Sequence, residues 1–290
     1  MPPSDPSPAP GPHALILDAD NTLWDTNRVF DRARAAMIRA LTNADRADGA
    51  AHAEADGDVL RSLGRHLSAP DAGGYPLEQL ARAAAFYMFG VDHGPHDAPD
   101  PAAPASRPAR AEWAARQARS DRRPAGIGPS RAGEAAEAFR SALSAVPPLL
   151  DGTRVLLDAV QGWRDDRPNR RTSILFSEGD PDRLGVAFGA YGIGNGRYFD
   201  DIVLREKTPD AFREVREAAG ASVEHPGPRA AGVVVVGDSL RRDIRPANAV
   251  GCTTVYCPGD FKGRETPEGP AERPDYTVDT PDEVMGVFGL

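Results

Sequence analysis

The stretch GVVVVGDSLRRD, residues 232–243, decides the fold. Its four consecutive valines are apolar on both faces, which is typical of a strand in the middle of a parallel sheet. The run ends at Gly237, and two carboxylates, Asp238 and Asp243, come after it. An apolar strand that ends in acidic residues predicts a polar site at the carboxyl edge of a parallel sheet.

Other apolar runs on either side of this stretch complete the pattern. The run HALIL at 13–17 ends at Asp18 and predicts a first strand. Asp180 and Thr208 each precede a proline, a pattern that starts helices. Alternating strands and helices predict a Rossmann-like α/β core with a parallel sheet and right-handed crossovers. The remaining strands are predicted at 172–176, 200–204, 253–257 and 276–278, and helices at 181–191, 209–219 and 247–250.

Residues 25–149 have a different composition. Ala, Arg and Glu are frequent there, and apolar residues recur at helical spacing, as at Phe30, Ala33, Met37 and Leu41. This pattern predicts an inserted α-helical domain. Within it, a Pro-rich stretch near 93–108 reads as a linker, and 124–133 reads as a second weak point.

The domain organisation follows from these patterns. The α/β core is expected to comprise residues 13–24 and 150–290, with the helical insert at 25–149 between its two parts. Residues 1–12 are rich in proline and read as a flexible tail. A chain of 290 residues is long enough for two such domains.

Charge and composition narrow the classes of protein. The formal net charge of −9 argues against a nucleic-acid partner, because phosphate backbones need a basic face. The apolar runs are too short to span a bilayer, and the N-terminus lacks the apolar segment of a signal peptide. Cys252 and Cys257 are expected on opposite faces of one strand, so they form no disulfide. We therefore expect a cytoplasmic protein without a membrane partner; the oligomeric state is not readable.

Polar residues follow several of the predicted strands. Asp18 and Asp20 come directly after the first strand, where one carboxylate suits a nucleophile and the other a proton donor or acceptor. Ser177 ends the second strand, just before a helix start whose free N–H groups suit a phosphoryl oxygen. Lys207 stands at the next junction of strand and helix and supplies a positive charge for the same anion.

Asp238 and Asp243 add two carboxylates to the same edge of the sheet. Crowded carboxylates repel one another and raise at least one pKa unless a cation compensates. Mg²⁺ prefers oxygen ligands, typically one or two carboxylates together with water and substrate phosphate. The sequence therefore predicts Mg²⁺ as the cofactor. It also predicts in-line attack by Asp18 on a phosphoryl group whose charge Mg²⁺ and Lys207 neutralise.

In these motifs the chain resembles the haloacid dehalogenase superfamily, in its phosphatase branch. DADNTL at 18–23 is similar to the first motif of that family, Ser177 to the second, Lys207 to the third and GDSLRRD at 237–243 to the fourth. The four motifs stand in the family's order. The resemblance covers residues 13–24 and about 150–290, and it does not extend through the helical insert.

The resemblance implies a role for each matching residue. Asp18 would be the nucleophile, and Asp20 would be the general acid/base and would offer its backbone carbonyl to the metal. Asp238 would ligate the metal together with Asp18, and Asp243 would ligate it or lie just behind the ligands. Ser177 and Lys207 would bind the phosphoryl group. The helical insert would be a cap that closes over the substrate.

These inferences predict a phosphomonoesterase that acts on a small phosphorylated metabolite through an aspartyl-phosphate. Two departures from the family pattern bear on the substrate: Glu178 introduces a charge beside Ser177, and the insert is long. The substrate itself is not readable from the sequence.

Several alternatives use the same residues. GDSL at 237–240 is also an esterase signature, but that chemistry needs a histidine after the serine, and the last histidine is His225. Dehalogenases of the superfamily lack the second aspartate, so Asp20 favours phosphoryl transfer. A phosphomutase of the same family stays open, as does a non-catalytic binding or regulatory protein that has this fold.

Overall fold

The chain divides into two compact units, residues 1–27 with 146–290 and residues 28–145. The predicted tail lies outside the described part of the chain except for Pro12, and residues 93–105 of the Pro-rich stretch also lie outside it. The computed structural model describes residues 12–42, 60, 62–63, 67, 77–89, 106–120, 122–125, 127–165, 171–194, 196–219, 232–259 and 264–288.

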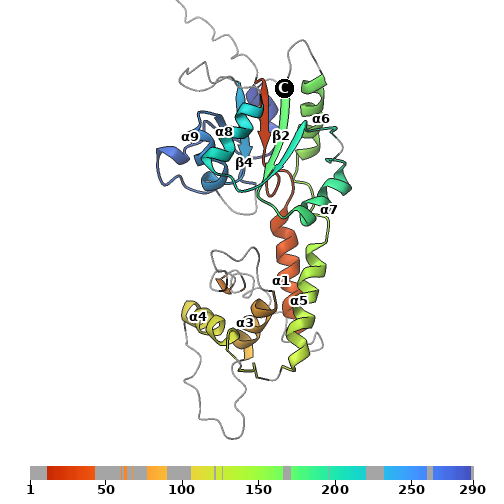
Figure 1. The fold of residues 1–290 in the computed structure, drawn as a ribbon, viewed down its shortest axis with the longest axis vertical. Helices are drawn as coiled ribbons and strands as arrows, with labels where there is room; N and C mark the ends of the chain where they lie inside the picture. Colours follow the sequence, from red (N-terminus) through yellow and green to blue (C-terminus); the bar gives the residue numbers. More distant parts are fainter. Residues whose placement is uncertain are drawn as a thin grey trace, which may run out of the picture. The chain divides into compact units, whose positions relative to one another are not determined.

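The first unit is built on a six-stranded parallel sheet in the order β3-β2-β1-β4-β5-β6 (Figure 1). This confirms the predicted α/β core with a parallel sheet. Each strand end lies within one residue of its predicted position. The strands are β1 (Ala14–Leu17), β2 (Thr172–Ser177), β3 (Asp201–Leu204), β4 (Val233–Gly237), β5 (Thr253–Tyr256) and β6 (Tyr276–Thr277).

Strands β1 and β4 lie side by side in the middle of this sheet. All residues of both strands are buried, which explains why they are apolar on both faces. Leu17 pairs with Val236, and the next N–H, that of Asp18, donates to the Val236 carbonyl at 2.9 Å. Because the strands are parallel and end together, Asp18 and Asp238 leave the sheet at the same edge.

Helices cover both faces of the sheet. Leu15 and Leu17 pack in one hydrophobic cluster with α6, α7 and α10, and Ala14 and Ile16 pack in another with α8 and α9. The alternation follows from the period of two in a strand. The helices are α6 (Thr153–Asp165), α7 (Pro181–Tyr191), α8 (Pro209–Ala218), α9 (Arg245–Ala249) and α10 (Glu283–Phe288).

The predicted helix starts at α7 and α8 are confirmed. The Asp180 carboxylate accepts the Arg183 N–H, and the Thr208 hydroxyl accepts the Ala211 N–H, so each side chain caps its helix. Helix α9 begins two residues before its predicted start, because Pro246 belongs to its first turn. The two cysteines are unbonded and belong to different clusters, Cys252 to one and Cys257 to the other, as expected of opposite faces.

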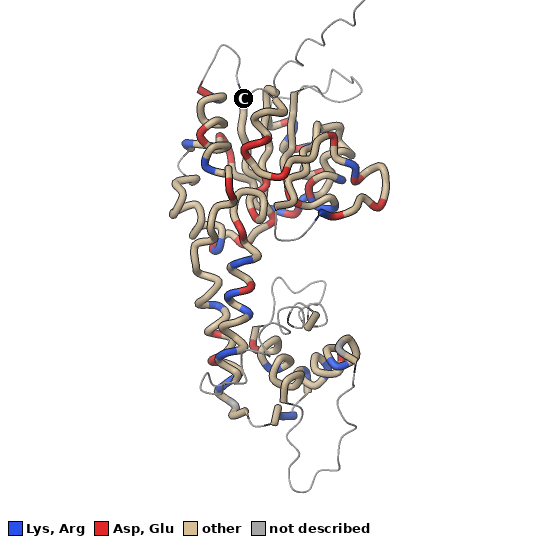
Figure 2. The backbone as a smooth tube through the Cα atoms, turned by 180° about the vertical axis from the view of Figure 1, so that it is seen from behind, with Lys and Arg blue, Asp and Glu red and all other residues tan. Residues whose placement is uncertain are grey.

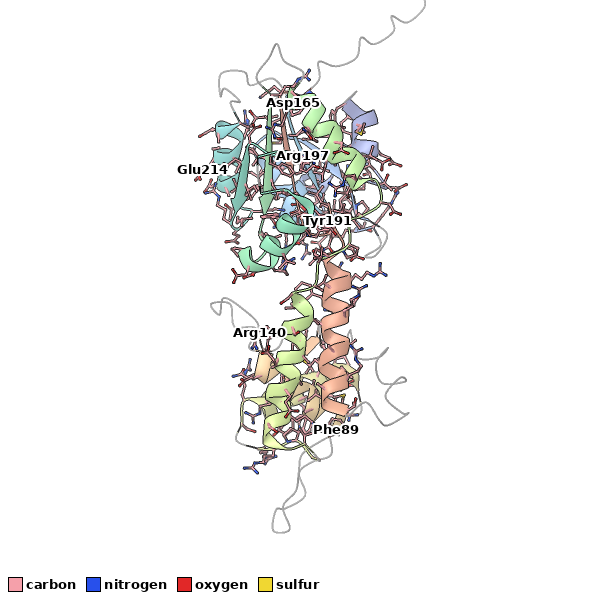
Figure 3. All side chains as sticks on the ribbon, turned by 90° about the vertical axis from the view of Figure 1, so that its right-hand side faces the viewer. Phe89, Arg140, Asp165, Tyr191, Arg197 and Glu214 are labelled. Atoms are coloured by element: carbon pink, nitrogen blue, oxygen red, sulfur yellow. The ribbon has the colours of Figure 1, made fainter. Side chains whose placement is uncertain are left out.

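The second unit is helical in its described residues. Its core includes Ala33, Met37 and Leu41 from the predicted helical face, and Phe86 packs edge to face on Trp113 with ring centroids 6.4 Å apart. Figure 3 labels Phe89 and Arg140 on this unit, and both side chains are exposed. The helices are α1 (Thr26–Thr42), α3 (Leu77–Phe89), α4 (Arg107–Ala118) and α5 (Pro129–Leu143).

Two predicted breaks in the helical unit are wrong in part. The weak point at 124–133 ends at Gly128, because α5 starts at Pro129, and the linker at 93–108 overlaps the first turn of α4. Proline fits the first helical turn without losing a hydrogen bond, so a proline there starts a helix and does not end one. Figure 2 shows basic and acidic residues along the helices of this unit. Among the described helices, none has both the length and the apolar composition needed to cross a bilayer.

Candidate active site

The loop after β1 fixes Asp18 at the edge of the sheet. The Thr22 hydroxyl donates to Asp18 Oδ2 at 2.9 Å. Asn21 has a positive φ of 61°, a conformation that asparagine adopts more readily than most residues, and its side chain accepts the Asn27 N–H at 3.0 Å. The tight turn and the hydroxyl contact together hold one carboxylate oxygen of Asp18 in place.

The segment after β4 turns Asp243 back toward the strand. It forms a short π-helical turn, η1 (Leu240–Ile244), a geometry that is often found at functional sites. Asp243 Oδ2 accepts the Ser239 N–H at 3.0 Å, and the side chain is buried. A Cβ atom at position 237 would overlap the Asp243 side chain, so Gly237 allows this close approach.

Lys207 joins two of these carboxylates. Its ammonium donates to Asp18 Oδ1 and, at 2.6 Å, to Asp243 Oδ1, and all three side chains are almost fully buried. The chain contains only two lysines among its 34 basic residues. A lysine in so arginine-rich a chain indicates that this position uses a compact point charge on a flexible stem.

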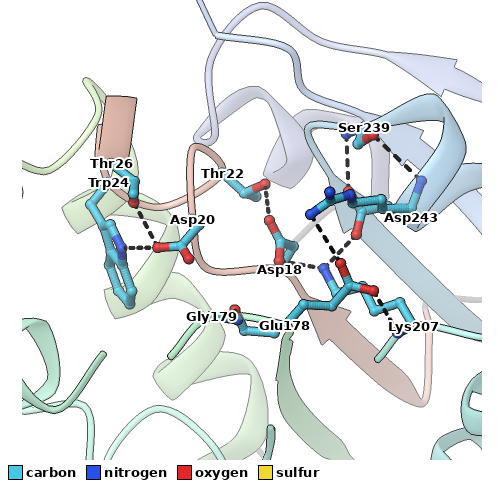
Figure 4. Close-up of polar contacts among 12 residues, drawn as sticks. Asp18, Asp20, Thr22, Trp24, Thr26, Glu178, Gly179, Lys207, Ser239 and Asp243 are labelled. Carbon is cyan, nitrogen blue, oxygen red and sulfur yellow. Dashed lines mark hydrogen bonds and ion pairs between the residues drawn. The ribbon is translucent and has the colours of Figure 1, made fainter. Parts of the chain in front are cut away.

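Figure 4 shows Asp18 and Asp243 on either side of this lysine. Asp238 completes a cluster of three carboxylates: all three residues are buried, and one oxygen from each lies within 4.8 Å of the others. The three carboxylates carry more negative charge than Lys207 alone offsets. Carboxylate oxygens are the donors that Mg²⁺ prefers, so the cluster suits a divalent cation.

The pKa values in the cluster reflect this shortage of positive charge. The pKa of Asp18 is raised to about 8, chiefly by burial and also by the neighbouring carboxylates of Asp243 and Asp238, against the opposing effect of Lys207. Burial alone would lower the pKa of Lys207, but the charges of Asp18 and Asp243 raise it above its ordinary value. Lys207 therefore stays protonated, and Asp18 needs a further cation to be a carboxylate at neutral pH.

The Asp20 carboxylate does not bond to Lys207 and has other hydrogen-bond partners. Its Oδ1 accepts hydrogen bonds from Trp24 Nε1 at 3.0 Å, Thr26 Oγ1 at 2.6 Å and Arg183 Nη1 at 2.8 Å, and Arg183 Nη2 donates to its Oδ2. Figure 4 shows the Asp20 carboxylate pointing toward Trp24 and Thr26 and away from Asp18. Burial would raise the pKa of Asp20, but the hydrogen bonds and charge of Arg183 outweigh it and hold the pKa below its usual value.

Ser177 and Glu178 occupy the end of β2. Ser177 is buried, and its hydroxyl accepts the Gly179 N–H at 3.1 Å. Glu178 Oε1 accepts the backbone N–H of Lys207 at 2.7 Å, and its Oε2 pairs with the exposed Arg242 at 3.2 Å. The Glu178 side chain, which lies in the loop after β2, thus contacts the loops that follow β3 and β4.

The structure therefore gathers four of the six sequence-derived site residues: Asp18, Lys207, Asp238 and Asp243. Their roles, like those of Asp20 and Ser177, remain predictions. Sequence reasoning missed Arg183, which binds the Asp20 carboxylate from α7. The cap at Asp180 places residue 183 in the first turn of that helix, but no sequence pattern indicates which carboxylate its side chain reaches.

Comparison with known proteins agrees with this fold. A family model described as HAD-hydrolase-like matches residues 206–284, a segment that contains Lys207, Asp238 and Asp243. None of the curated proteins compared with the chain matches it.

Three solved structures align over nearly the whole chain. The HAD-hydrolase YfnB from Bacillus subtilis, bound to magnesium, has a TM-score of 0.56 and 15% identity, covering 97% of this chain and 100% of its own. A haloacid dehalogenase-like family hydrolase from Xanthomonas campestris has a TM-score of 0.52 and 17% identity, covering 97% of each chain. A phosphoglycolate phosphatase, described as predicted, from Haemophilus somnus has a TM-score of 0.51 and 15% identity, covering 95% and 97%.

The family model thus supports the resemblance to the haloacid dehalogenase superfamily over residues 206–284, and the solved structures show that the fold is shared along nearly the whole chain.

Proposed function

We propose that the protein is a Mg²⁺-dependent phosphomonoesterase that forms an aspartyl-phosphate on Asp18. The observation that carries the proposal is the buried cluster of Asp18, Asp238 and Asp243 around Lys207. A cluster of this charge suits one divalent cation and one phosphoryl group. The substrate would be a small phosphorylated metabolite, and we propose the cytoplasm as the compartment.

The residues present fit a magnesium ion. Oxygens on opposite sides of Mg²⁺ lie about 4 Å apart, and the three carboxylates already lie within 4.8 Å of one another. Asp18 and Asp238 would ligate the ion with their side chains, Asp20 would offer its backbone carbonyl, and Asp243 would ligate or support them. When bound, Mg²⁺ supplies positive charge that favours the Asp18 carboxylate and offsets charge on a phosphoryl group.

The side chains divide the reaction between them. Asp18 Oδ attacks phosphorus, the bond between phosphorus and the ester oxygen breaks, and the phosphoryl group is carried on Asp18. Lys207 and Ser177 bind the phosphoryl oxygens. Asp20 donates a proton to the leaving alkoxide and then accepts one from the water that hydrolyses the aspartyl-phosphate. Thr22 and Lys207 orient Asp18 throughout, through its two oxygens.

Asp20 favours phosphoryl transfer over dehalogenation. A halide leaves without a proton, so a dehalogenase has no use for a second acidic residue at this position. Two of the similar structures support the proposal by their descriptions: the Bacillus subtilis protein is bound to magnesium, and the Haemophilus somnus protein is described as a phosphoglycolate phosphatase. We propose that residues 28–145 form a cap that selects the substrate.

The proposal is tested by phosphate release from a panel of phosphorylated metabolites, with Mg²⁺ or with EDTA. We expect turnover only with Mg²⁺ and its loss in Asp18→Asn. Full activity of Asp18→Asn would exclude the nucleophile, and failure to hydrolyse any ester would favour a non-catalytic protein. An isomeric phosphate in place of free phosphate would identify a phosphomutase.

A further inference from the structure

Arg183 and Asp20 form an ion pair within the first unit. Arg183 donates from both terminal nitrogens to the two oxygens of Asp20, and the exposed fractions of the two side chains are 14% and 19%. Gly179 makes room for the pair, because a Cβ there would lie 2.6 Å from Asp20 Oδ2 and 2.7 Å from Arg183 Nη2. A bidentate ion pair of this kind is strong and directional.

This arrangement conflicts with proton donation in place. Four N–H or O–H groups point at the Asp20 carboxylate: one each from Trp24 and Thr26, and two from Arg183. A carboxyl group that gives its proton to a leaving oxygen must turn an O–H toward that oxygen, and the protonated oxygen is a much weaker acceptor for a guanidinium than a carboxylate oxygen is. Asp20 therefore has to break the bidentate pair with Arg183 before it acts as an acid.

We propose that Arg183 then binds a second anionic group of the substrate. This inference rests on the proposed function and specifies its substrate class: phosphate monoesters that carry a carboxylate or a second phosphate near the ester. The anion binds the Arg183 guanidinium as Asp20 releases it, so Asp20 becomes available when such a substrate is present. A substrate without the second anion leaves the ion pair intact and reacts slowly.

Burial makes this exchange selective. Removing one partner from a buried ion pair is costly, because the remaining charge is poorly solvated. Water replaces a carboxylate at such a site less well than another anion does. Arginine also has the flat fork that matches carboxylate and phosphate oxygens, so Arg183 is suited to exchange one oxyanion for another.

The test compares matched substrates that differ only in charge. The probes are 2-phosphoglycolate and the phosphate ester of 3-hydroxypropionate, each compared with its neutral carboxamide in the presence of Mg²⁺. The variants are Arg183→Gln, Arg183→Lys, Gly179→Ala and a control, Arg164→Gln. Arg164 is a comparably buried arginine on α6 that pairs with Asp200 at 3.3 Å, away from Asp20.

We expect the wild-type protein to favour at least one carboxylate probe over its carboxamide by about tenfold or more in kcat/KM. Arg183→Gln should bring this ratio close to one. Arg183→Lys should retain part of the preference for the carboxylate, and Arg164→Gln should leave the ratio unchanged. Gly179→Ala forces the ion pair apart, so it should raise kcat/KM for the carboxamide and thereby lower the ratio. A wild-type ratio near one for both pairs, or an equal loss on both probes in Arg183→Gln, would overturn the proposal.

A readout without turnover separates this inference from the proposed function. In the Asp18→Asn background, the carboxylate probes should raise Tm more than the carboxamides do, and Arg183→Gln should abolish the difference. If no probe is hydrolysed but this difference is seen, the anion site stands and the phosphatase does not. If hydrolysis is Mg²⁺-dependent but Tm and kcat/KM are the same for the carboxylate and the carboxamide probes, the phosphatase proposal stands and the anion site is wrong.

Discussion

The ammonium of Lys207 lies 2.6 Å from a carboxylate oxygen of Asp243, although 36 positions separate the two residues in the chain. The same ammonium donates to Asp18. Among the described residues, Lys207 thus bonds to two of the three carboxylates of a cluster that also contains Asp238. The predictions below follow from the charges of this cluster and from the contacts that hold it together.

Without metal, the stability of the wild-type protein should fall as pH rises from about 5 to 8. The Asp18 pKa is about 8 in the folded protein, whereas an unfolded aspartate has a pKa of about 3.9. In this window the folded state binds more protons than the unfolded state, so the free energy of unfolding decreases with pH, by about 3–4 kcal/mol. Urea unfolding in EDTA at several pH values measures it.

Asp18→Asn provides the control for this pH dependence. The amide does not titrate, so the metal-free variant should lose the slope and be more stable than the wild-type protein at pH 8. Mg²⁺ should stabilise the wild-type protein at pH 8 more than the variant, because the ion binds the ionised carboxylate. A metal-free stability that rises through this window, or an equal slope in both proteins, would contradict the assignment.

The sheet and the four clustered residues could be predicted because each depends on a local pattern. A run that is apolar on both faces, such as 232–236, fits a central parallel strand, and parallel strands bring their carboxyl ends to one edge. Asp18 and Asp238 follow a strand directly and Lys207 lies three positions after one, so their strands alone place them near that edge. Asp243 needed more, since its return to the edge depends on the π-helical turn and on the space at Gly237.

The parts that could not be predicted depend on contacts between distant segments. The Arg183 side chain meets Asp20 across 163 positions, and neither residue type signals the other. The sequence predicted only that Glu178 places a charge beside Ser177, yet its two oxygens bind the Lys207 backbone and Arg242. Pro129 read as part of a break because a proline interrupts a helix but also starts one, and the sequence pattern did not distinguish the two.

Asp243→Asn should weaken Mg²⁺ binding without unfolding the protein. The change removes one of three negative charges and weakens one of the two ion pairs of Lys207. We expect the Mg²⁺ concentration for half-maximal activity to rise about tenfold or more. Asp158→Asn is the control, since Asp158 is half-exposed and pairs with Arg197 only at 3.6 Å. Unchanged Mg²⁺ dependence in Asp243→Asn would place Asp243 outside the metal site.

Glu178 should matter as a hydrogen-bond acceptor more than as a charge. Glu178→Ala leaves the Lys207 N–H without its acceptor, so the loop that carries Lys207 should loosen and KM for the phosphate ester should rise about tenfold. Glu178→Gln keeps an oxygen in place and should change KM less than about threefold. Arg242→Gln tests the charge separately, and because Arg242 is exposed its loss should have little effect. Equal effects of Gln and Ala at 178 would show that charge decides.

Gly237→Ala should damage the site through Asp243 alone. The added methyl group overlaps the Asp243 side chain, which would have to move from its contacts with Lys207 and the Ser239 N–H. We expect a loss of about 2–3 kcal/mol in the free energy of unfolding, together with a rise in the Mg²⁺ requirement similar to that of Asp243→Asn.

Gly162→Ala adds the same methyl group in helix α6, where nothing lies within 4 Å of the new atom. There it should stabilise the protein by about 0.5–1 kcal/mol, because alanine favours helix more than glycine does. Urea unfolding and Mg²⁺ titration of both variants separate the two effects. Normal Mg²⁺ binding in Gly237→Ala would mean that Asp243 can leave its present position without loss, and the close approach at Gly237 would then serve packing and not the metal.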